Sequence, residues 1–274
     1  NIHTGGYSNP NVPSDPDFNT NYGAALASQS GLIFYPAGTV NRSTFTGINP
    51  QGPTALGRFQ WSAASATIMN EVSPVNVGIQ SSIDLSTNTM FVDVEIYYTG
   101  TQNINSNQLN IAIVQNSVLG PQNGGANYNP NDYNPNTGLY THNNILRHML
   151  TGQWGETISN ISPGTLYTNS YTWIIPNQLS GFSLSPLIDV TDLAVVAFVS
   201  EGNQEILSGT EIEPDLIFSN AYDANLIGSY ATDITCTPTT DLTVDFKNYG
   251  NTNLTSLNIE YSINGGTSTI YPWN

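Results

Sequence analysis

Basic side chains are scarce in this sequence. Its 274 residues hold four Lys and Arg against 20 Asp and Glu, which gives a formal net charge of −16. A nucleic-acid-binding protein needs clustered Lys and Arg to displace the counterions of phosphates, and an anionic membrane surface would repel this charge. The composition therefore excludes nucleic acid as a partner. The four cations stand singly along the chain, at Arg42, Arg58, Arg147 and Lys247.

Cysteine and long apolar runs are also nearly absent. Cys236 is the single cysteine, so no intrachain disulfide forms and no C-x-x-C pair is available for redox chemistry. No run approaches the roughly 18 apolar residues of a spanning helix, so we expect no membrane-spanning segment. The chain is long enough to bury a core by packing alone.

Catalytic motifs are missing as well. His3, His142 and His148 are the only histidines, and no G-x-S-x-G elbow accompanies them. His142 and His148 are six residues apart, which places them on different faces of a helix and argues against a metal pair. No phosphate-cradling glycine motif occurs either. We expect no catalytic residues and no enzyme activity, with His142 starting a short helix and bonding a loop carbonyl.

Alternation of apolar and polar residues predicts a mainly β protein. Val92, Val94, Ile96 and Tyr98 alternate with Asp, Glu and Tyr, and residues 193–199 are apolar throughout. Alternation indicates strands with one buried face, and a fully apolar run indicates a strand that is buried on both faces. The pattern is typical of an antiparallel β-sandwich with residues 193–199 at its centre.

Shorter elements are expected around this sandwich. Residues 22–30 and 143–150 predict helices, the second because its apolar residues share one helical face. Residues 32–35 predict a strand that Pro36 stops, and the strand resumes at residues 40–42. Both ends of the chain look abrupt, which predicts a fragment of a longer precursor.

Oxygen-bearing side chains alternate near the N-terminus, at Asp15, Asp17, Asn19 and Asn21. This spacing is how a loop wraps Ca²⁺, although the bidentate Glu of an EF-hand is missing. We therefore keep Ca²⁺ as a candidate cofactor here. A second acidic group, which is either a Ca²⁺ site or a solvated rim, consists of Glu201, Glu205, Glu211, Glu213 and Asp215.

A loop rich in Asn, Pro and Tyr spans residues 123–140 and carries Tyr128, Tyr133 and Tyr140. Aromatic rings beside amide side chains suit the surfaces of sugars and of protein partners. The same rings serve equally well to pin the loop to the sandwich. The three tyrosines are therefore candidate ligand-binding residues for a glycan or a peptide.

Six short stretches carry a resemblance to a known family. They are IHTGG at 2–6, DFNT at 17–20, YPAGTVNR at 35–42, YTHNNILR at 140–147, LTGQWGE at 150–156 and DFKNYG at 245–250. Together they resemble the Omp28-related family of secreted and outer-membrane surface proteins in Bacteroidota. The first three resemble the latter half of that family's thioredoxin-like domain, the next two its central signature, and the last the opening of appended immunoglobulin-like repeats.

This resemblance implies an organisation and a location. Residues 1–60 would be the latter half of a thioredoxin-like domain, residues 61–232 a β-sandwich domain, and residues 233–274 an incomplete immunoglobulin-like domain. Pro36 would stand in the loop where thioredoxin folds carry a cis-proline. Export by a type 9 secretion route would place the chain outside the cell or on the outer-membrane surface.

Three functions fit these expectations. The first is a non-catalytic structural protein that self-associates into filaments, because truncated domains leave unpaired strand edges. The second is a surface adhesin or binding module for a glycan or a peptide. The third is a thioredoxin-like redox protein whose cysteine-bearing half is missing from this sequence. The absence of catalytic motifs favours the first.

Overall fold

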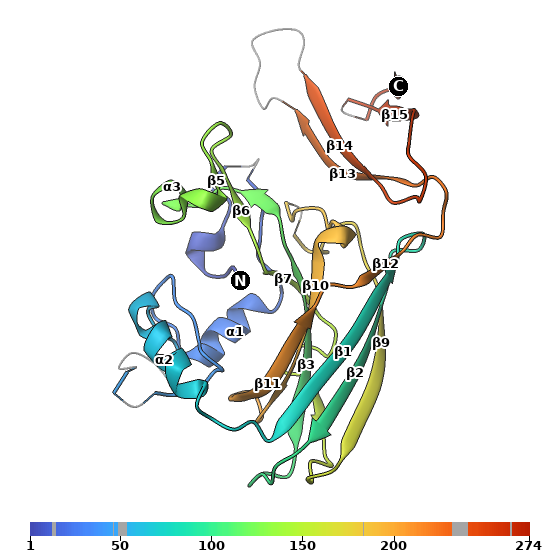
Figure 1. The fold of residues 1–274 in the computed structure, drawn as a ribbon. Coiled ribbons are helices and arrows are strands. Elements are labelled where there is room, and N and C mark those ends of the chain that lie inside the picture. The colour runs from blue at the N-terminus through green and yellow to red at the C-terminus, as the bar shows by residue number, and fades with distance from the viewer. Residues whose placement is uncertain (13–14, 46, 49–53, 183, 232–240, 264) are drawn as a thin grey trace.

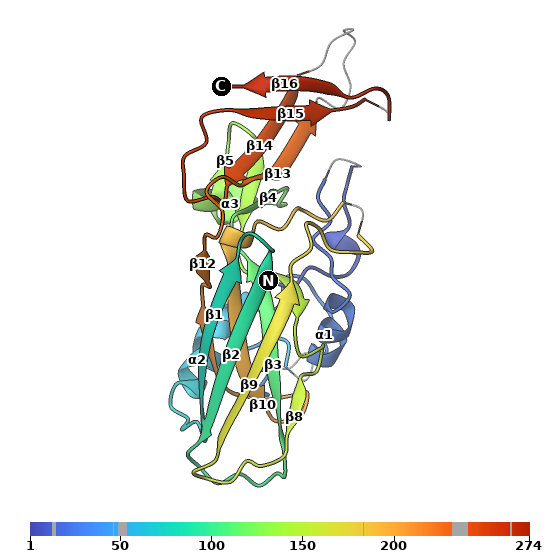
Figure 2. The same cartoon turned by 90° about the vertical axis from the view of Figure 1, so that its right-hand side faces the viewer.

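Two β-sheets packed face to face form the centre of the molecule (Figure 1, Figure 2). The structure, a computed structural model, describes the chain except residues 13–14, 46, 49–53, 183, 232–240 and 264. Across the first sheet lie β12 (Asp215–Ile217), β1 (Val75–Asp84), β2 (Thr89–Tyr98) and β9 (Leu166–Ile174). Across the second lie β11 (Ile206–Ile212), β10 (Leu193–Ser200), β3 (Asn107–Gln115) and β7 (Ile145–Met149), with β8 (Glu156–Ile158) also paired to β3.

The strands of these sheets are antiparallel except β12, which runs parallel to β1. Alternate residues of β2, such as Val94 and Ile96, share one apolar core with Ile111 of β3 and Val195 of β10. β10 lies between β11 and β3, as its apolar sequence predicts. The predicted fold class, a mainly β protein built on an antiparallel sandwich, is confirmed.

The N-terminal segment covers the outer face of the second sheet. Its helix α1 (Gly23–Ser30) confirms the predicted helix and buries Leu26 against Ala112, Leu146 and Met149. Gly31 ends the helix at φ 64°, a left-handed conformation that glycine adopts without steric cost. Because α1 covers this face, β10 and β7 are buried on both sides of the sheet.

The helix predicted at residues 143–150 is wrong, because this segment contains strand β7. Ile145 packs with Phe18 and Val118, whereas Leu146 and Met149 pack beneath α1. A register shift against β3 leaves the intervening arginine out of the pairing. The apolar residues therefore occupy two buried faces of a bulged strand, a pattern that matches helical periodicity in so short a run.

The strands predicted at residues 32–35 and 40–42 are also wrong. The described backbone here forms turns, with one isolated bridge between Gly38 and Leu56. Arg42 adopts φ 50°, a left-handed conformation that breaks a strand. The peptide bond before Pro36 is cis, the form that the resemblance implied.

A small three-stranded sheet stands at one end of the sandwich. Its strands are β4 (Val118–Gly120), β6 (Leu139–His142) and β5 (Tyr133–Asn134), in that order. The predicted loop at residues 123–140 is thus partly folded, and His142 ends a strand instead of starting a helix. The remaining short helices are η1 (Gly6–Ser8), η2 (Arg58–Gln60), α2 (Trp61–Ile68), α3 (Gly125–Tyr128), η3 (Pro130–Asp132) and η4 (Val190–Asp192).

Two ribbons of two strands each stand beyond the same end of the sandwich (Figure 2). Asp189 anchors them, because its carboxylate lies 2.7 Å from Lys247 Nζ and accepts a hydrogen bond from Tyr249 Oη at 2.8 Å. The rings of Phe246 and Trp273 meet edge-on, with centroids 5.1 Å apart, and join the ribbons. The ribbons are β13 (Ala224–Ala231) with β14 (Leu242–Asn248), and β15 (Leu257–Tyr261) with β16 (Thr269–Trp273).

The expected domain boundaries at residues 60 and 232 stay predictions. β13 lies before the second boundary and pairs with β14 after it. Cys236 falls outside the described residues. The thioredoxin-like and immunoglobulin-like assignments of the two terminal segments likewise stay predictions.

Candidate functional site

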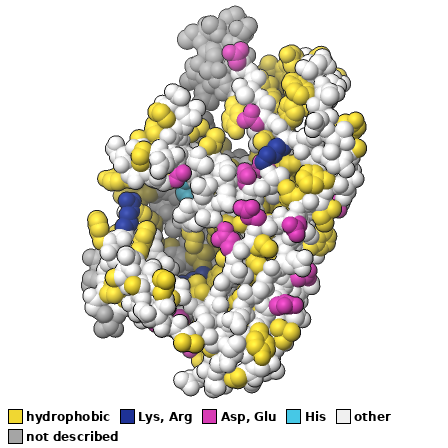
Figure 3. Space-filling model, viewed as in Figure 1, with side chains coloured by type: hydrophobic (Ala, Val, Ile, Leu, Met, Phe, Trp, Pro, Cys, Tyr) yellow, Lys and Arg dark blue, Asp and Glu magenta, His cyan; other side chains and the backbone are white. Residues whose placement is uncertain are grey.

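A cavity of about 550 Å³ lies between the N-terminal segment and the small sheet. Its lining comes from residues 1–4, from α1 and the turns that follow it, and from Trp61, Gln122, Tyr140 and His142. Figure 3 shows the hollow on this face, bordered mainly by hydrophobic and uncharged side chains. Segments that are far apart in the sequence thus meet at one concave site.

The charge of this lining differs from that of the whole chain. Among the described residues that line the cavity there is no Asp or Glu, and Arg42 is the only Lys or Arg. The complete chain carries five times as many acidic as basic residues, 20 against 4. Arg42 is therefore the only charged side chain in the described lining, whose other side chains are neutral at pH 7.

A chain of aromatic contacts fixes α1 as one wall. The Tyr22 hydroxyl lies 2.9 Å from His148 Nδ1, and the His148 ring stacks on Trp173 with centroids 4.8 Å apart. Trp173 belongs to β9, at the edge of the first sheet, and His148 to β7, at the edge of the second. The helix is thus tied to both sheets, which makes the wall part of the sandwich.

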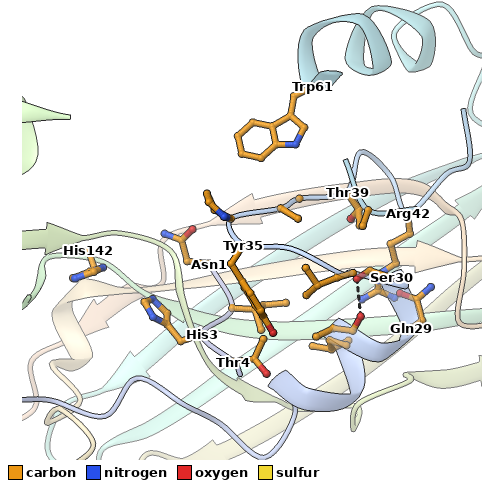
Figure 4. Close-up of a pocket in the computed structure, with 18 of the residues that line it drawn as sticks. Asn1, His3, Thr4, Gln29, Ser30, Tyr35, Thr39, Arg42, Trp61 and His142 are labelled. Atoms are coloured by element: carbon orange, nitrogen blue, oxygen red, sulfur yellow. Dashed lines mark hydrogen bonds between the residues drawn. The ribbon is translucent and has the colours of Figure 1, made fainter. Parts of the chain in front are cut away.

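Trp61 forms a second wall, across the cavity from Tyr35 and Thr4 in Figure 4. Its indole Nε1 donates a hydrogen bond to the Leu56 carbonyl at 3.2 Å. Gly38 permits this position, since a Cβ atom there would lie 3.0 Å from indole Cζ2. A larger residue at this position would push the ring out of place.

Arg42 stands at one end of the cavity (Figure 4). Its backbone carbonyl accepts a hydrogen bond from Gln204 Nε2 at 2.8 Å, and Gln204 Oε1 accepts one from Gln29 Nε2 at 2.8 Å. The guanidinium carbon lies 5.2 Å from the ring centroid of Phe198. Nη1 is buried and has no hydrogen-bond partner among the described residues. Burial lowers the pKa of Arg42, but a guanidinium keeps its charge at neutral pH.

His3 and His142 stand at the opposite end (Figure 4). Their ring centroids are 5.5 Å apart, and the Phe18 ring lies within 5 Å of both, at 4.9 and 4.7 Å. His142 is only 3% exposed, and its Nε2 is buried without a hydrogen-bond partner among the described residues. Burial lowers the pKa of both histidines, that of His3 to about 4, so both rings are neutral at pH 7.

One of the three candidate tyrosines lines the cavity. Tyr140 does so, and its hydroxyl accepts a hydrogen bond from Asn129 Nδ2 at 2.9 Å. Tyr133 is its cross-strand partner in the small sheet. Tyr128 is 78% exposed, outside the cavity, with the Arg58 guanidinium 5.5 Å from its ring centroid. The structure therefore separates Tyr128 from the other two.

The candidate Ca²⁺ ligands lie in turns of the N-terminal segment. Asp15 accepts backbone hydrogen bonds from residues 11 and 12, and Asp17 accepts from the backbone and side-chain amides of Asn19 at 2.9 and 2.6 Å. Asn21 is exposed in the turn that precedes α1. Among the described residues, no group of three or more His, Cys, Asp or Glu could hold a metal ion. Calcium binding at Asp15, Asp17, Asn19 and Asn21 stays a prediction.

Sequence reasoning missed most of the residues that line the cavity. Arg42 looked like one of four scattered cations, Trp61 like the residue before the first strands, and His142 like a helix start. One signal was present, because the stretches at 2–6, 35–42 and 140–147 carry the family resemblance and all reach the cavity.

The sequence matches the outer membrane protein Omp28 family over residues 24–212. The chain belongs to this family. The match includes α1, every strand of both sheets except β12, and most of the cavity lining. The resemblance seen in the sequence is confirmed, and with it the expected place of an Omp28-family chain at the outer-membrane surface. Among the described residues, no helix has the length and apolar character needed to cross a membrane.

Two solved structures from Porphyromonas gingivalis are similar to this Omp28-family chain. HBP35 matches with a TM-score of 0.52 at 13% identity, covering 91% of this chain and 78% of that one. A domain of the outer membrane lipoprotein Omp28 matches with a TM-score of 0.33 at 15% identity, covering 53% of this chain and 92% of that one. No curated protein matches the sequence. The likeness to HBP35 shows a shared fold.

Proposed function

We propose that this Omp28-family chain is a non-catalytic surface protein that binds a small ligand in the cavity between its N-terminal segment and its sandwich. The preformed cavity of about 550 Å³ carries this proposal. Ligand sites are typically concavities of roughly 300–1,000 Å³ with mostly apolar walls and a few polar groups. Here Leu26, Trp61 and Tyr35 provide such walls, and Arg42 and His142 provide polar groups.

An unpaired charge supports a binding role. Arg42 lines the cavity, and its guanidinium forms no ion pair within the described residues. A partly buried cation without a counterion is unfavourable. A ligand that fills the cavity would supply the missing partner.

Blocking the mouth of the cavity is expected to abolish binding. Thr39 lines the cavity and is exposed, so Thr39→Phe narrows the mouth without disturbing the core. The probe is N-phenyl-1-naphthylamine, an uncharged dye whose fluorescence rises in apolar surroundings. We expect saturable binding by the wild type and an affinity lower by about tenfold or more for Thr39→Phe.

The matched control is Thr44→Phe, which places the same ring at an exposed position outside the cavity. Its affinity for the dye should equal that of the wild type. If the two variants bind the dye equally well, the cavity is not the binding site and the proposal fails.

A second role, self-association through strand edges, is favoured by the C-terminal ribbons. Each ribbon has two strands within the described residues, which leaves both of its edges unpaired. Apolar side chains stand on the ribbons, with Leu226 53%, Tyr230 57%, Ile270 62% and Tyr271 59% exposed. Unpaired edges with apolar side chains recruit further strands, and head-to-tail contacts between copies build filaments.

Charged substitutions on these ribbons should dissociate any assembly. We expect native material to sediment as oligomers, and Tyr230→Lys with Tyr271→Lys to sediment as monomers, because lysine discourages pairing at an edge. The control is Tyr7→Lys, an equally drastic change at a residue that is 88% exposed elsewhere in the chain. Native material that is strictly monomeric would rule out this role.

The other functional expectations for this chain stay predictions. A thioredoxin-like redox role depends on residues outside this sequence, and a type 9 secretion route depends on a sorting segment outside it. An adhesin that binds a glycan or a peptide remains compatible with the cavity, whose wall includes Tyr140.

A further inference from the structure

We propose that the ligand of this cavity is an organic monocarboxylate: one carboxylate, bound by Arg42, on an apolar or aromatic body that packs between Trp61, Tyr35 and α1. This inference rests on the proposed function and names the ligand class of the same cavity. The two can fail separately, and the experiment below distinguishes them.

The charge of the cavity points to an anion. Arg42 is the only Lys or Arg among the described lining residues, and no Asp or Glu lines the cavity with it. Lys247 and Asp189 form the one ion pair among the described residues, so the Arg42 guanidinium has no carboxylate partner there. A cation that is held in a cavity without a counterion provides a site for an anionic ligand.

The geometry of the guanidinium points to a carboxylate. Its planar fork offers parallel N–H donors that match the two oxygens of a carboxylate. The Arg42 guanidinium lies over the Phe198 ring, and the one hydrogen bond from Gln204 goes to the Arg42 backbone carbonyl, not to the guanidinium. The Arg42 side chain donates no hydrogen bond within the described residues, so its guanidinium is available to a ligand that enters the cavity.

The number of charges points to a monoanion. His3 and His142, at the other end of the cavity, are neutral at pH 7 because burial lowers the pKa of each. A phosphate dianion would place a second negative charge in a cavity that provides one side-chain cation. The neutral rings of His3 and His142 therefore provide no cation for a second anionic group at the far end of the cavity.

The test compares a carboxylate with its uncharged isostere. Indole-3-acetate and indole-3-acetamide share an aromatic body and differ in the carboxylate, and calorimetry measures both on the full chain. We expect wild-type protein to prefer the acetate by about tenfold, and Arg42→Gln to remove this preference, since a hydrogen bond to a charged group contributes about 1.5–3 kcal/mol. Binding of the acetamide to Arg42→Gln should stay within about threefold of wild type and show that the cavity is intact.

Arg58→Gln is the matched control, because it removes the same charge from an exposed residue that does not line the cavity. It should keep the preference for the acetate. A second pair, N-acetyl-Phe-Leu with a free or an amidated C-terminus, tells a peptide carboxylate from a free small acid. The proposal is supported if wild-type protein prefers the free acid in either pair and Arg42→Gln loses this preference. The pair that shows it tells whether the carboxylate belongs to a small acid or to a peptide C-terminus.

Two results would overturn it. In the first, wild-type protein binds acid and amide equally well in both pairs. In the second, it binds neither pair but still binds N-phenyl-1-naphthylamine. Either result means that the cavity takes an uncharged ligand, and only this inference fails. If the dye does not bind either, the proposed function fails with it.

Discussion

Replacing Arg147 with alanine is expected to destabilise the fold by about 3 kcal/mol or more, the loss typical of a large void combined with a broken buried polar contact. Arg147 is 1% exposed in β7, the most deeply buried charge that the structure describes. Its Nη2 donates to the Pro186 carbonyl at 2.6 Å and to Ser185 Oγ at 3.3 Å. Alanine would remove these donors and leave the segment before η4 tied to the sheet by Gln115 of β3, whose Nε2 donates to the Leu187 carbonyl at 3.3 Å.

Methionine at the same position separates volume from charge. Burial lowers the pKa of Arg147 to about 10, which reflects the free energy needed to keep this cation out of water. Arg147→Met keeps most of the buried volume and removes that penalty, but it leaves the Pro186 carbonyl without its donor. We therefore expect it to lose less than half of the stability that alanine loses.

Urea unfolding at neutral pH measures both changes. Arg58→Ala, at an exposed position, provides the baseline and should stay within about 0.5 kcal/mol of wild type. Equal losses for alanine and methionine would contradict this account of Arg147, because they would show that the hydrogen bonds, and not the filled volume, dominate.

The strand that carries Arg147 could not be predicted from the sequence, whereas β2 could. β2 was predictable because one face is buried and the other wet, so that Val94 and Ile96 alternate with Asp93 and Glu95. β7 was not, because α1 covers one face and Phe18 with Val118 the other, and a bulge at Arg147 breaks the two-residue period. A strand that is buried on both faces and bulged in the middle carries no pattern that distinguishes it from a helical turn.

The cavity could not be derived from local pattern at all. Its walls come from segments separated by more than a hundred residues. Residues 32–42 contribute more of the lining than any other segment, and their backbone forms turns. Long-range packing of α1 on β7 and β3 brings Arg42 and His142 to opposite ends of one space. Of the residues singled out from the sequence as ligand-binding, Tyr140 alone reaches that space. The family resemblance indicated which stretches matter, but not that they meet.

Acidification is expected to destabilise the folded chain between about pH 6.5 and pH 4, because its histidines are buried in their neutral form. Burial is the largest cause that lowers the pKa of His3, His142 and His148, and the pKa of His3 falls to about 4. In the unfolded chain each histidine titrates near its ordinary value of about 6.5. In this window the unfolded state therefore binds more protons, so stability is complete above it and is lost as the pH falls through it.

For His3 alone the shift corresponds to roughly 3 kcal/mol once the pH has fallen below its folded pKa. Two carboxyls work in the opposite direction, since burial raises the pKa of Asp192 and of Glu205, and protonation of these groups favours the folded state. Measurements between about pH 7.5 and pH 5.5 keep their contribution small, because carboxyl groups titrate mainly below this range.

The double variant His3→Gln with His142→Gln isolates the effect. Both rings contact Phe18 at one end of the cavity, and glutamine carries no charge at any of these pH values. Urea unfolding across the window should show wild-type stability falling with pH and the slope for the double variant reduced by more than half. The remainder is due to His148 and the N-terminal amine, whose pKa values burial also lowers. An unchanged slope would mean that these two histidines admit protons without unfolding. Their end of the cavity would then be open to water.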